Sequence, residues 1–338
     1  MESPHTLPSF PAARFIKEIG RGKKGARSIS REDARELYAA MLDGCVSDLE
    51  LGAIVLAMRI KGESVDEIAG FLDAAEDSFE KLQVPDSEFA PVVIPSYNGS
   101  RNMPNLTPLL ALLLARQGVP VLVHGVPSDP GRVTTAEILQ QLGLPFAQNA
   151  NQAQAGFARR EPVFMPIEAL APRMAHLLAI RRILGVRNST HTLVKIVQPF
   201  ACPALRLTSY THPEYFEMLT AYFTTAAPPQ RGDIFLMRGT EGETVANARR
   251  ANRIEWFHDH QCTVLVEKQA PVDELPPLPP QSDASSTAKW IVEALNGVHP
   301  IPVPIAEQVE HCLHVTRRLQ GSNANKSPFG SVSPTEHY

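Results

Sequence analysis

The stretch of sequence that decides the fold is residues 91–143, PVVIPSYNGSRNMPNLTPLLALLLARQGVPVLVHGVPSDPGRVTTAEILQQLG. Two short runs in it have the apolar, β-branched composition of buried strands, and each leads through a turn-forming loop into a helical pattern that a glycine ends. The strands and helices are expected at 92–94, 106–117, 119–123 and 134–141. Strand, loop and helix in this order predict a βαβ unit whose ligand-facing edge lies at the carboxyl ends of the strands. The loops at that edge are 95–105 and 124–133.

Upstream, three serines mark regular helix starts. Ser30, Ser47 and Ser64 each stand three residues before a carboxylate and precede an apolar helical pattern. This is the capping-box arrangement, in which aspartate serves less well than glutamate. We therefore predict a helical domain of about four helices over residues 13–88, after a Pro-rich, disordered segment at 1–12.

Downstream, strand and helix patterns continue to alternate. Strands are expected at 163–165, 205–208, 233–237 and 263–267, and helices at 171–185, 191–197, 213–224, 287–295 and 304–319. The predicted fold class is α/β with a separate α-helical domain, in which helices flank a central, mostly parallel sheet. The α/β domain would span 89–319, its helices near 171–197 packing with the helical domain, and 320–338 would form a flexible tail.

Composition excludes several classes of protein. The chain is 43% hydrophobic and 20% charged, as is ordinary for a globular protein, and its longest apolar run, 109–115, is too short to span a bilayer. No basic segment leads into an apolar run at the amino terminus, so we expect no signal peptide and no membrane partner. The four cysteines form no CxxC pair, which argues against zinc or a disulfide framework. A cytoplasmic location is the expectation.

Charge is unevenly distributed along the chain. The formal net charge is −4, yet Arg14 to Arg35 holds eight Lys/Arg against three Asp/Glu, and Arg159 to Arg206 holds eight against two. Such segments can alternate around a solvated surface, or they can hold an anionic partner on one face.

Several short stretches resemble the anthranilate and nucleoside phosphoribosyltransferases of glycosyltransferase family 3. They are Asn105-Leu106-Thr107, His124-Gly125, the EILQQLG helix at 137–143 and the RRILGVR segment at 181–187, and the resemblance covers roughly residues 15–315. It implies the fold of that family, an α domain followed by an α/β domain.

The residues that carry the family's chemistry are mostly replaced. Where the family has a GTGGD loop that cradles pyrophosphate, this chain has PSYNG at 95–99. Where the family has a KHGNR loop followed by two serines, this chain has VHGVP at 123–127 and then Pro130-Gly131. The acid pair for the metal falls at Thr244-Val245, although Glu241 and Glu243 lie beside it. The enzyme assignment is thus uncertain and leans towards no enzyme, with no catalytic residue, no metal and no cofactor expected.

The chain is more similar to one subgroup, the YbiB-type nucleic-acid-binding proteins. The matching stretches are KEIGRGK at 17–23, IPSYNG at 94–99, NLTPLLA at 105–111, GVRNS at 185–189, HPEY at 212–215 and GTEGE at 239–243. The resemblance implies a homodimer paired through the helical domain, which binds DNA or RNA with little sequence preference along a basic groove.

Three basic sets are candidate nucleic-acid contacts. They are Arg21, Lys23, Lys24 and Arg27; Arg181, Arg182, Arg187 and Lys195; and Arg249, Arg250 and Arg253. The first set could instead be a solvated loop, and the second could form inter-domain ion pairs. Because Arg181 and Arg182 are adjacent on one helix, we expect at least one of them to be structural.

A vestigial phosphate or substrate cleft is the other candidate site. Its residues are Ser96, Tyr97, Asn98, Gly99, Arg101, Asn105, Thr107, His124, Gly125 and Arg132. Tyr97 could stack on a base or fill a vacated pocket, and His124 could be catalytic or simply packed at a strand end. Arg101 and Arg132 are the residues expected to meet any anion in the cleft.

Two alternatives to nucleic-acid binding remain open. One is an active phosphoribosyl- or glycosyltransferase with a modified phosphate grip (Arg101, Arg132 and Glu243), and magnesium is expected only in that case. The other is a sensor whose nucleic-acid affinity responds to a small anion in the cleft.

Overall fold

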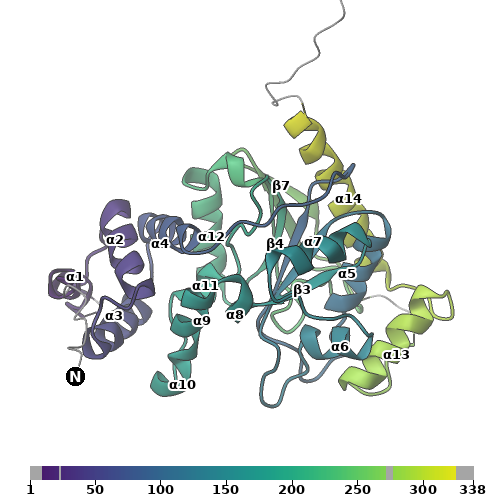
Figure 1. Ribbon diagram of the computed structural model, residues 1–338, viewed down its shortest axis with the longest axis horizontal. Helices are drawn as coiled ribbons and strands as arrows, with labels where there is room; N and C mark the ends of the chain where they lie inside the picture. The colour runs from purple at the N-terminus through teal and green to yellow at the C-terminus, as the bar shows by residue number, and fades with distance from the viewer. Residues whose placement is uncertain (1–9, 23, 272–276, 325–338) are drawn as a thin grey trace, which may run out of the picture.

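The computed structural model describes residues 10–22, 24–271 and 277–324. A bundle of helices lies at one end of the molecule and α13 and α14 lie at the other, with the sheet between them (Figure 1). The bundle consists of α1 (Ala13–Ile19), α2 (Arg31–Leu42), α3 (Asp48–Lys61) and α4 (Val65–Asp77). The predicted helical domain is thereby confirmed.

Alternating strands and helices make up the body. The strands are β1 (Val92–Ser96), β2 (Val121–Gly125), β3 (Val163–Pro166), β4 (Leu205–Ser209), β5 (Ile234–Met237), β6 (Ile254–His258) and β7 (Gln261–Val266). The α-helices are α5 (Thr107–Arg116), α6 (Thr135–Gln141), α7 (Ala150–Ala158), α8 (Ile167–Leu170), α9 (Pro172–Ala179), α10 (Arg181–Leu184), α11 (Thr190–Leu193), α12 (Pro213–Thr225), α13 (Ala284–Leu295) and α14 (Val303–Ala324). A 3₁₀ turn, η1 (Pro229–Arg231), precedes β5.

Serine caps set the starts of three bundle helices. At Ser47 and Ser64 both halves of the capping box form: the side chain accepts from the N3 backbone N–H, and the N3 glutamate accepts from the serine N–H. At Ser30 the hydroxyl accepts from the Asp33 N–H. The reciprocal bond is not among the described contacts there, because an aspartate is one methylene shorter than a glutamate.

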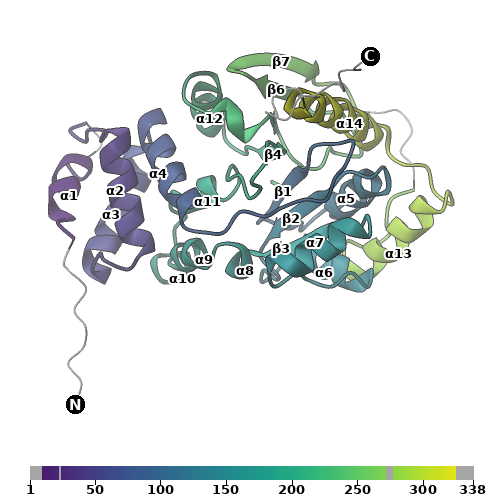
Figure 2. The ribbon, with the colours of Figure 1, turned by 45° about the horizontal axis from the view of Figure 1, so that its top comes forward.

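A single sheet organises the body. Its strand order is β3-β2-β1-β4-β5-β6-β7. The first five strands in this order are parallel to one another, and the pairs β5–β6 and β6–β7 are antiparallel. Val92 and Ile94 pack into a core with residues of α5, α6, α13 and α14, whereas Val93 faces a second core that continues into the bundle. Figure 2 shows α13 and α14 on the side away from the bundle. The predicted fold class, α/β with a separate helical domain and a mostly parallel sheet, is confirmed.

The bundle and the body share a buried contact. Helix α9 packs on α2, and α11 packs on α4. The Tyr38 hydroxyl bonds to Thr190 Oγ1 at 2.8 Å, and both residues are buried. A buried hydroxyl pair of this kind fixes the relative position of the two elements that carry it.

Some elements differ from the sequence prediction. Helix α7 and strand β6 were not predicted. The predicted helix at 171–185 is two helices, α9 and α10, which are separated by Ile180. Helix α14 continues to Ala324, past the predicted start of the tail at 320.

The predicted disorder at 1–12 is wrong for its last three residues. The ring of Phe10 stacks on Phe15 at 5.5 Å, and Ala12 is fully buried. Residues 1–9 and 325–338 lie outside the described part of the chain. Within the described part, no helix is both long and apolar enough to cross a membrane.

Candidate functional site

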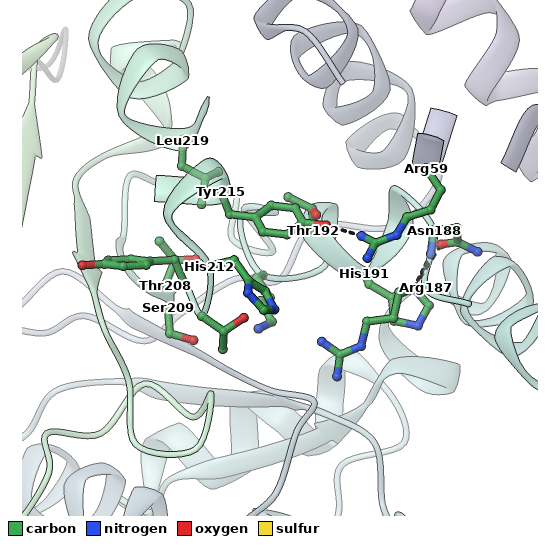
Figure 3. A pocket seen from close by; sticks show the side chains of 13 residues that line it. Arg59, Arg187, Asn188, His191, Thr192, Thr208, Ser209, His212, Tyr215 and Leu219 are labelled. Atoms are coloured by element: carbon green, nitrogen blue, oxygen red, sulfur yellow. Dashed lines mark hydrogen bonds between the residues drawn. The ribbon is translucent and has the colours of Figure 1, made fainter. Parts of the chain in front are cut away.

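The main pocket lies where the strand order of the sheet reverses. β1 pairs with β2 on one side and with β4 on the other, and the later strands run outward in both directions. In an open α/β sheet, ligands bind beyond the carboxyl ends of such neighbouring strands. Here the pocket begins at Thr208 and Ser209, at the end of β4. Its other walls come from α3, the segment 187–195 and α12, around an empty volume of about 590 Å³ that is partly open to solvent (Figure 3).

Cationic side chains converge on this pocket. Arg59, Arg187 and Lys195 line it, and none of its lining residues is Asp or Glu. Within the described chain, no ion pair of 4 Å or less joins these three cations to a carboxylate. Burial and then the charge of Arg187 lower the pKa of Lys195 to about 8, against the opposing effect of Glu243. The pKa of Arg187 is also lowered, first by burial and then by nearby arginines. The pocket therefore carries a positive charge that no carboxylate in its lining offsets.

Local structure holds the two arginines in place. Gly185 ends α10 in the left-handed region at φ 72°, which turns the chain towards the pocket. Arg187 Nη2 then donates to Asn98 Oδ1 at 3.0 Å. Arg59 Nη1 donates to the Tyr215 hydroxyl at 2.6 Å. Figure 3 shows Arg59 and Arg187 entering the pocket from the same side, with Tyr215 and His212 opposite. Each guanidinium still has N–H donors for a ligand.

Aromatic rings complete the wall provided by the start of α12. The rings of His212 and Tyr215 lie 6.5 Å apart at a 46° tilt, and both residues line the pocket. His191 lies across from them, and its pKa is lowered to about 4 by burial and then by Arg187 and Arg181. His191 is consequently neutral at pH 7. Cations that bind phosphate and rings on which a base can stack are together the requirements of a nucleotide site.

Two further members of the second predicted set lie beside the pocket. Arg181 and Arg182 are both exposed on α10. Neither side chain has a hydrogen-bond or ion-pair partner in the described chain. The expectation that one of them is structural is wrong, because α10 is a single turn projecting into solvent rather than the middle of a long helix (Figure 1). Arg181 is close enough to Arg187 to affect its pKa.

The first predicted set lies elsewhere. Arg21, Lys24 and Arg27 are exposed in the connection between α1 and α2, at the far end of the bundle from the sheet (Figure 1). Arg21 forms an ion pair with Glu18 at 2.7 Å. Lys23 lies outside the described residues. The structure therefore does not bring this set together with the pocket.

The third set is partly neutralised. Arg253 forms ion pairs with Glu255 at 2.8 Å and with Glu267 at 4.0 Å. Arg249 is exposed and Arg250 is half-buried in the loop before β6. These three arginines are not among the residues that line the pocket.

The two loops of the predicted cleft pack on each other. Ser96 Oγ donates to Thr135 Oγ1 at 2.8 Å, and Asn105 Nδ2 donates to the same oxygen at 3.1 Å. Asn105 Oδ1 in turn accepts from the Thr107 N–H. A Cβ at Gly125 would lie 1.7 Å from the Ser96 carbonyl oxygen, so only glycine allows this approach. These predicted cleft residues support the strand ends and bond to one another.

The half-buried Tyr97 and the buried His124 form a pair. The Tyr97 hydroxyl bonds to His124 Nδ1 at 2.8 Å, and the rings meet edge to face. Burial lowers the pKa of His124 to about 3, so the imidazole is neutral at physiological pH. This geometry is that of the packed histidine, and it directs Tyr97 inward, to fill space.

The backbone of loop 98–103 is occupied by carboxylates of the chain itself. Glu243 Oε1 accepts from the N–H groups of Asn98 at 2.9 Å and Gly99 at 2.7 Å. Glu241 accepts from the N–H groups of Arg101 and Asn102, at 2.6 and 3.2 Å. The Arg101 side chain is exposed.

The remaining cleft cation, Arg132, lies next to this loop. Arg132 Nη1 donates to the Gly99 carbonyl oxygen at 3.3 Å. Its charge also acts on Arg187, whose pKa it helps to lower. Arg132 is thus close to the main pocket, whereas Arg101 is tied to the loop through its backbone.

The described residues do not fit a magnesium ion. The positions aligned with the transferases' acid pair are Thr244 and Val245, which are buried and carry no carboxylate. The neighbouring Glu241 and Glu243 already accept backbone N–H groups. No group of three His, Cys, Asp or Glu side chains among the described residues could hold a metal.

Sequence reasoning missed part of the pocket. Arg59 occupies one position in an ordinary amphipathic helix and carries no local signal. His212 and Tyr215 lie in the HPEY stretch that contributed to the family resemblance, and a ring pair at a helix start after a strand was a usable signal.

Comparison of the sequence with known proteins gives three similarities. Residues 13–79 match the helical bundle domain of a glycosyl transferase family. The chain is 46% identical over 305 residues to YbiB of Escherichia coli (strain K12), whose name states no function; the match covers 90% of this chain and 93% of that one. It is 30% identical over 185 residues to an anthranilate phosphoribosyltransferase of Methylobacterium radiotolerans, covering 53% of this chain and 50% of the enzyme.

Solved structures show the same fold. Anthranilate phosphoribosyltransferase from Thermus thermophilus superimposes with a TM-score of 0.69 at 20% identity, covering 92% of this chain and 89% of that one. The Saccharomyces cerevisiae enzyme, in complex with PRPP and Mg, gives 0.68 at 14% identity, covering 94% and 90%. The scaffold is therefore that of the phosphoribosyltransferases.

Proposed function

The chain belongs to the family of Escherichia coli YbiB, within the anthranilate phosphoribosyltransferase-like superfamily of glycosyltransferase family 3, and on this basis we propose that it binds DNA or RNA with little sequence preference. In this proposal the scaffold of the transferases is retained and its phosphoribosyl chemistry is not. The phosphates of the nucleic acid are the ligands of the pocket cations.

The observation that carries the proposal is the positive charge that lines the pocket. Arg59, Arg187 and Lys195 face one space with no carboxylate among its lining residues. Arg59 is exposed, and Arg187 and Lys195 are half-buried. Partly desolvating the last two without a carboxylate in the lining is unfavourable, and a bound phosphate relieves it. A chain of phosphates would extend the contact to Arg181 and Arg182, which are exposed beside the pocket.

The ring pair bears on which form of nucleic acid is bound. His212 and Tyr215 line the pocket beside the cations. A base can reach and stack on a ring in a pocket only when it is unpaired, and stacking tolerates every base. We therefore expect single strands to bind more tightly than duplex, without a preferred sequence.

We also propose that the functional unit is a homodimer joined through the bundle. Leu56 and Ile60 of α3 are 47% and 56% exposed, and they line an apolar groove together with Ile16 of α1. Leu49, at the start of α3, is 86% exposed. Large apolar side chains gathered on one helix are characteristic of an interface, and the occupant we expect is a second copy of the chain.

The test is equilibrium binding of a fluorescein-labelled, mixed-sequence single-stranded oligonucleotide, followed by anisotropy. Arg187→Gln removes a pocket charge, and Arg35→Gln removes one from an exposed ion pair on α2 as the matched control. We expect wild type and Arg35→Gln to bind alike and Arg187→Gln to bind at least tenfold more weakly. Equal affinity of all three would refute the assignment to this pocket.

The transferase alternative has its own measurement. Wild-type protein is incubated with phosphoribosyl pyrophosphate, magnesium and anthranilate or a nucleobase, and pyrophosphate release is followed. We expect no turnover. Pyrophosphate release by the wild-type protein that is lost in Arg101→Ala or Arg132→Ala would favour the transferase alternative.

A further inference from the structure

The loop after β1 has the geometry of an anion site. The backbone N–H groups of Asn98, Gly99, Arg101, Asn102 and Met103 all donate to carboxylates of one hairpin, whereas that of Ser100 donates to the Val133 carbonyl oxygen. Gly99 adopts a positive φ of 64° that permits the turn. Successive N–H groups in such a turn form a concave nest whose partial positive charge favours an anion. This nest is built of backbone, so side-chain substitutions in the loop do not remove it.

Two carboxylates fill the nest. Glu243 Oε1 takes the N–H groups of Asn98 and Gly99, and Glu241 takes those of Arg101, Asn102 and Met103. Glu241 also accepts from Asn102 Nδ2 at 2.9 Å. Burial acts to raise the pKa of Glu241, but the hydrogen bonds from the loop outweigh it and leave that pKa below its usual value.

Among the described residues, Glu243 has no side-chain hydrogen-bond partner other than the nest, and its charge also acts on Lys195. Its side chain is 1% exposed, Oε1 bonds only to the two loop N–H groups, and Oε2 has no hydrogen-bond partner in the described chain. Burying a carboxylate with one oxygen unpaired is costly unless the remaining contacts are strong. The nest supplies those contacts, as it would for a bound phosphate oxygen.

The hairpin that carries both glutamates is fixed against the loop. Thr240 and Glu243 pair across it, and Gly242 has a φ of 94°. The Gly242 carbonyl oxygen accepts from Asn98 Nδ2 at 2.7 Å and from Ser209 Oγ at 2.8 Å. A Cβ on Gly242 would lie 2.4 Å from the Asn98 amide nitrogen, so this close packing requires glycine.

We propose that Glu243 and Glu241 are built-in occupants of this anion site, which exclude free phosphate and pyrophosphate from loop 98–103. The carboxylate oxygens take the N–H groups that a phosphate would need. Phosphate groups are thereby restricted to the cations of the main pocket. This inference concerns the loop alone and does not rest on nucleic-acid binding.

Isothermal titration of the full chain with inorganic pyrophosphate tests the proposal. Wild type is compared with Glu243→Ala, which empties the inner half of the nest, and with Glu243→Gln, whose amide oxygen still accepts both N–H groups. We expect Glu243→Ala to bind pyrophosphate at least tenfold more tightly than wild type, and Glu243→Gln to match wild type. Pyrophosphate that binds to the wild-type protein would bind to cations outside loop 98–103. The readout is therefore the difference in pyrophosphate affinity between each variant and wild type.

Folding is checked by circular dichroism and thermal melting on the same samples. Pyrophosphate should raise the melting temperature of Glu243→Ala by several degrees more than that of wild type. If Glu243→Ala does not fold, Glu241→Ala is titrated instead, because it frees the outer N–H groups from a half-buried position. A folded alanine variant with no gain, or an equal gain in Glu243→Gln, overturns the proposal. Oligonucleotide binding of the same variants separates this result from the proposed function.

Discussion

Arg59 of α3 donates a hydrogen bond to the hydroxyl of Tyr215 at the start of α12, at 2.6 Å. The two residues are 156 positions apart in the sequence. Their bond, drawn as a dashed line in Figure 3, joins the bundle to the body at the pocket. The candidate site is therefore assembled from both parts of the fold, and neither part contains it alone.

The ring of Tyr215 should matter more than its hydroxyl. Tyr215→Ala removes a stacking surface, and we expect it to weaken binding of a single-stranded oligonucleotide about tenfold, since base–aromatic stacking contributes about 1–3 kcal/mol. Tyr215→Phe keeps the ring and loses only the bond to Arg59, so it should bind within about threefold of wild type. Anisotropy titrations compare the three proteins. Equal losses in both variants would show that the ring does not contact a base.

Affinity should fall as pH rises through the pKa of Lys195. That pKa is lowered from 10.5 to about 8 by burial, so the ammonium is mostly charged at pH 7 and mostly neutral at pH 9. Loss of one phosphate-binding charge should weaken oligonucleotide binding severalfold between these pH values. Lys195→Arg stays charged throughout and should remove this dependence. A pH profile that is the same in both proteins would contradict the role given to Lys195.

The exposed groove of α1 and α3 should hold the dimer together. Leu56→Glu/Ile60→Glu places two charges on that surface, and repulsion and desolvation should convert a dimer into a monomer. Light scattering coupled to size exclusion measures the mass. Val292→Glu/Val298→Glu, at exposed apolar positions remote from the bundle, is the control and should leave the mass unchanged. A monomeric wild type would refute the dimer.

His124 should make the fold less stable in mild acid. Its folded pKa of about 3 lies below the unfolded value of 6.5, so its contribution to stability is complete above pH 6.5 and is lost as pH falls from 6.5 towards 3. At pH 5 the loss should be about 2 kcal/mol. His124→Asn does not titrate and retains an oxygen for the Tyr97 hydroxyl. Urea unfolding at pH 7 and pH 5 should show a smaller decrease in the variant, and an equal decrease would contradict the assignment.

The sequence was sufficient to predict the fold because its signals are local. The capping serines at 47 and 64, the βαβ pattern of 91–143 and the glycine stops each depend on neighbouring residues only. Strand β6 was missed although Ile254, Trp256 and Phe257 are apolar, because the arginine-rich segment before it indicated an exposed loop. Helix α7 was missed although Asn149 caps it, since its Ala/Gln composition gives a weak apolar pattern.

The site was only partly predictable because it depends on strand order. The sequence predicted that a ligand would bind at the carboxyl ends of the strands, and it identified Arg187 and Lys195 as candidate contacts. That β4 lies beside β1, with the pocket at the carboxyl end of β4, follows from tertiary pairing that no local pattern encodes. The same holds for Glu243, whose carboxylate reaches a loop 144 residues earlier in the chain.

The most direct test of the central claim is the salt dependence of single-stranded oligonucleotide binding by the wild-type protein. Each phosphate neutralised by a cation adds about −0.7 to the slope of log affinity against log salt. With three pocket cations engaged, we expect a slope of about −2 or steeper, and a slope shallower by about 0.7 in Arg187→Gln. Absent binding, or affinity that does not change between 50 and 200 mM salt, would contradict the proposal that this scaffold binds nucleic acid through its phosphates.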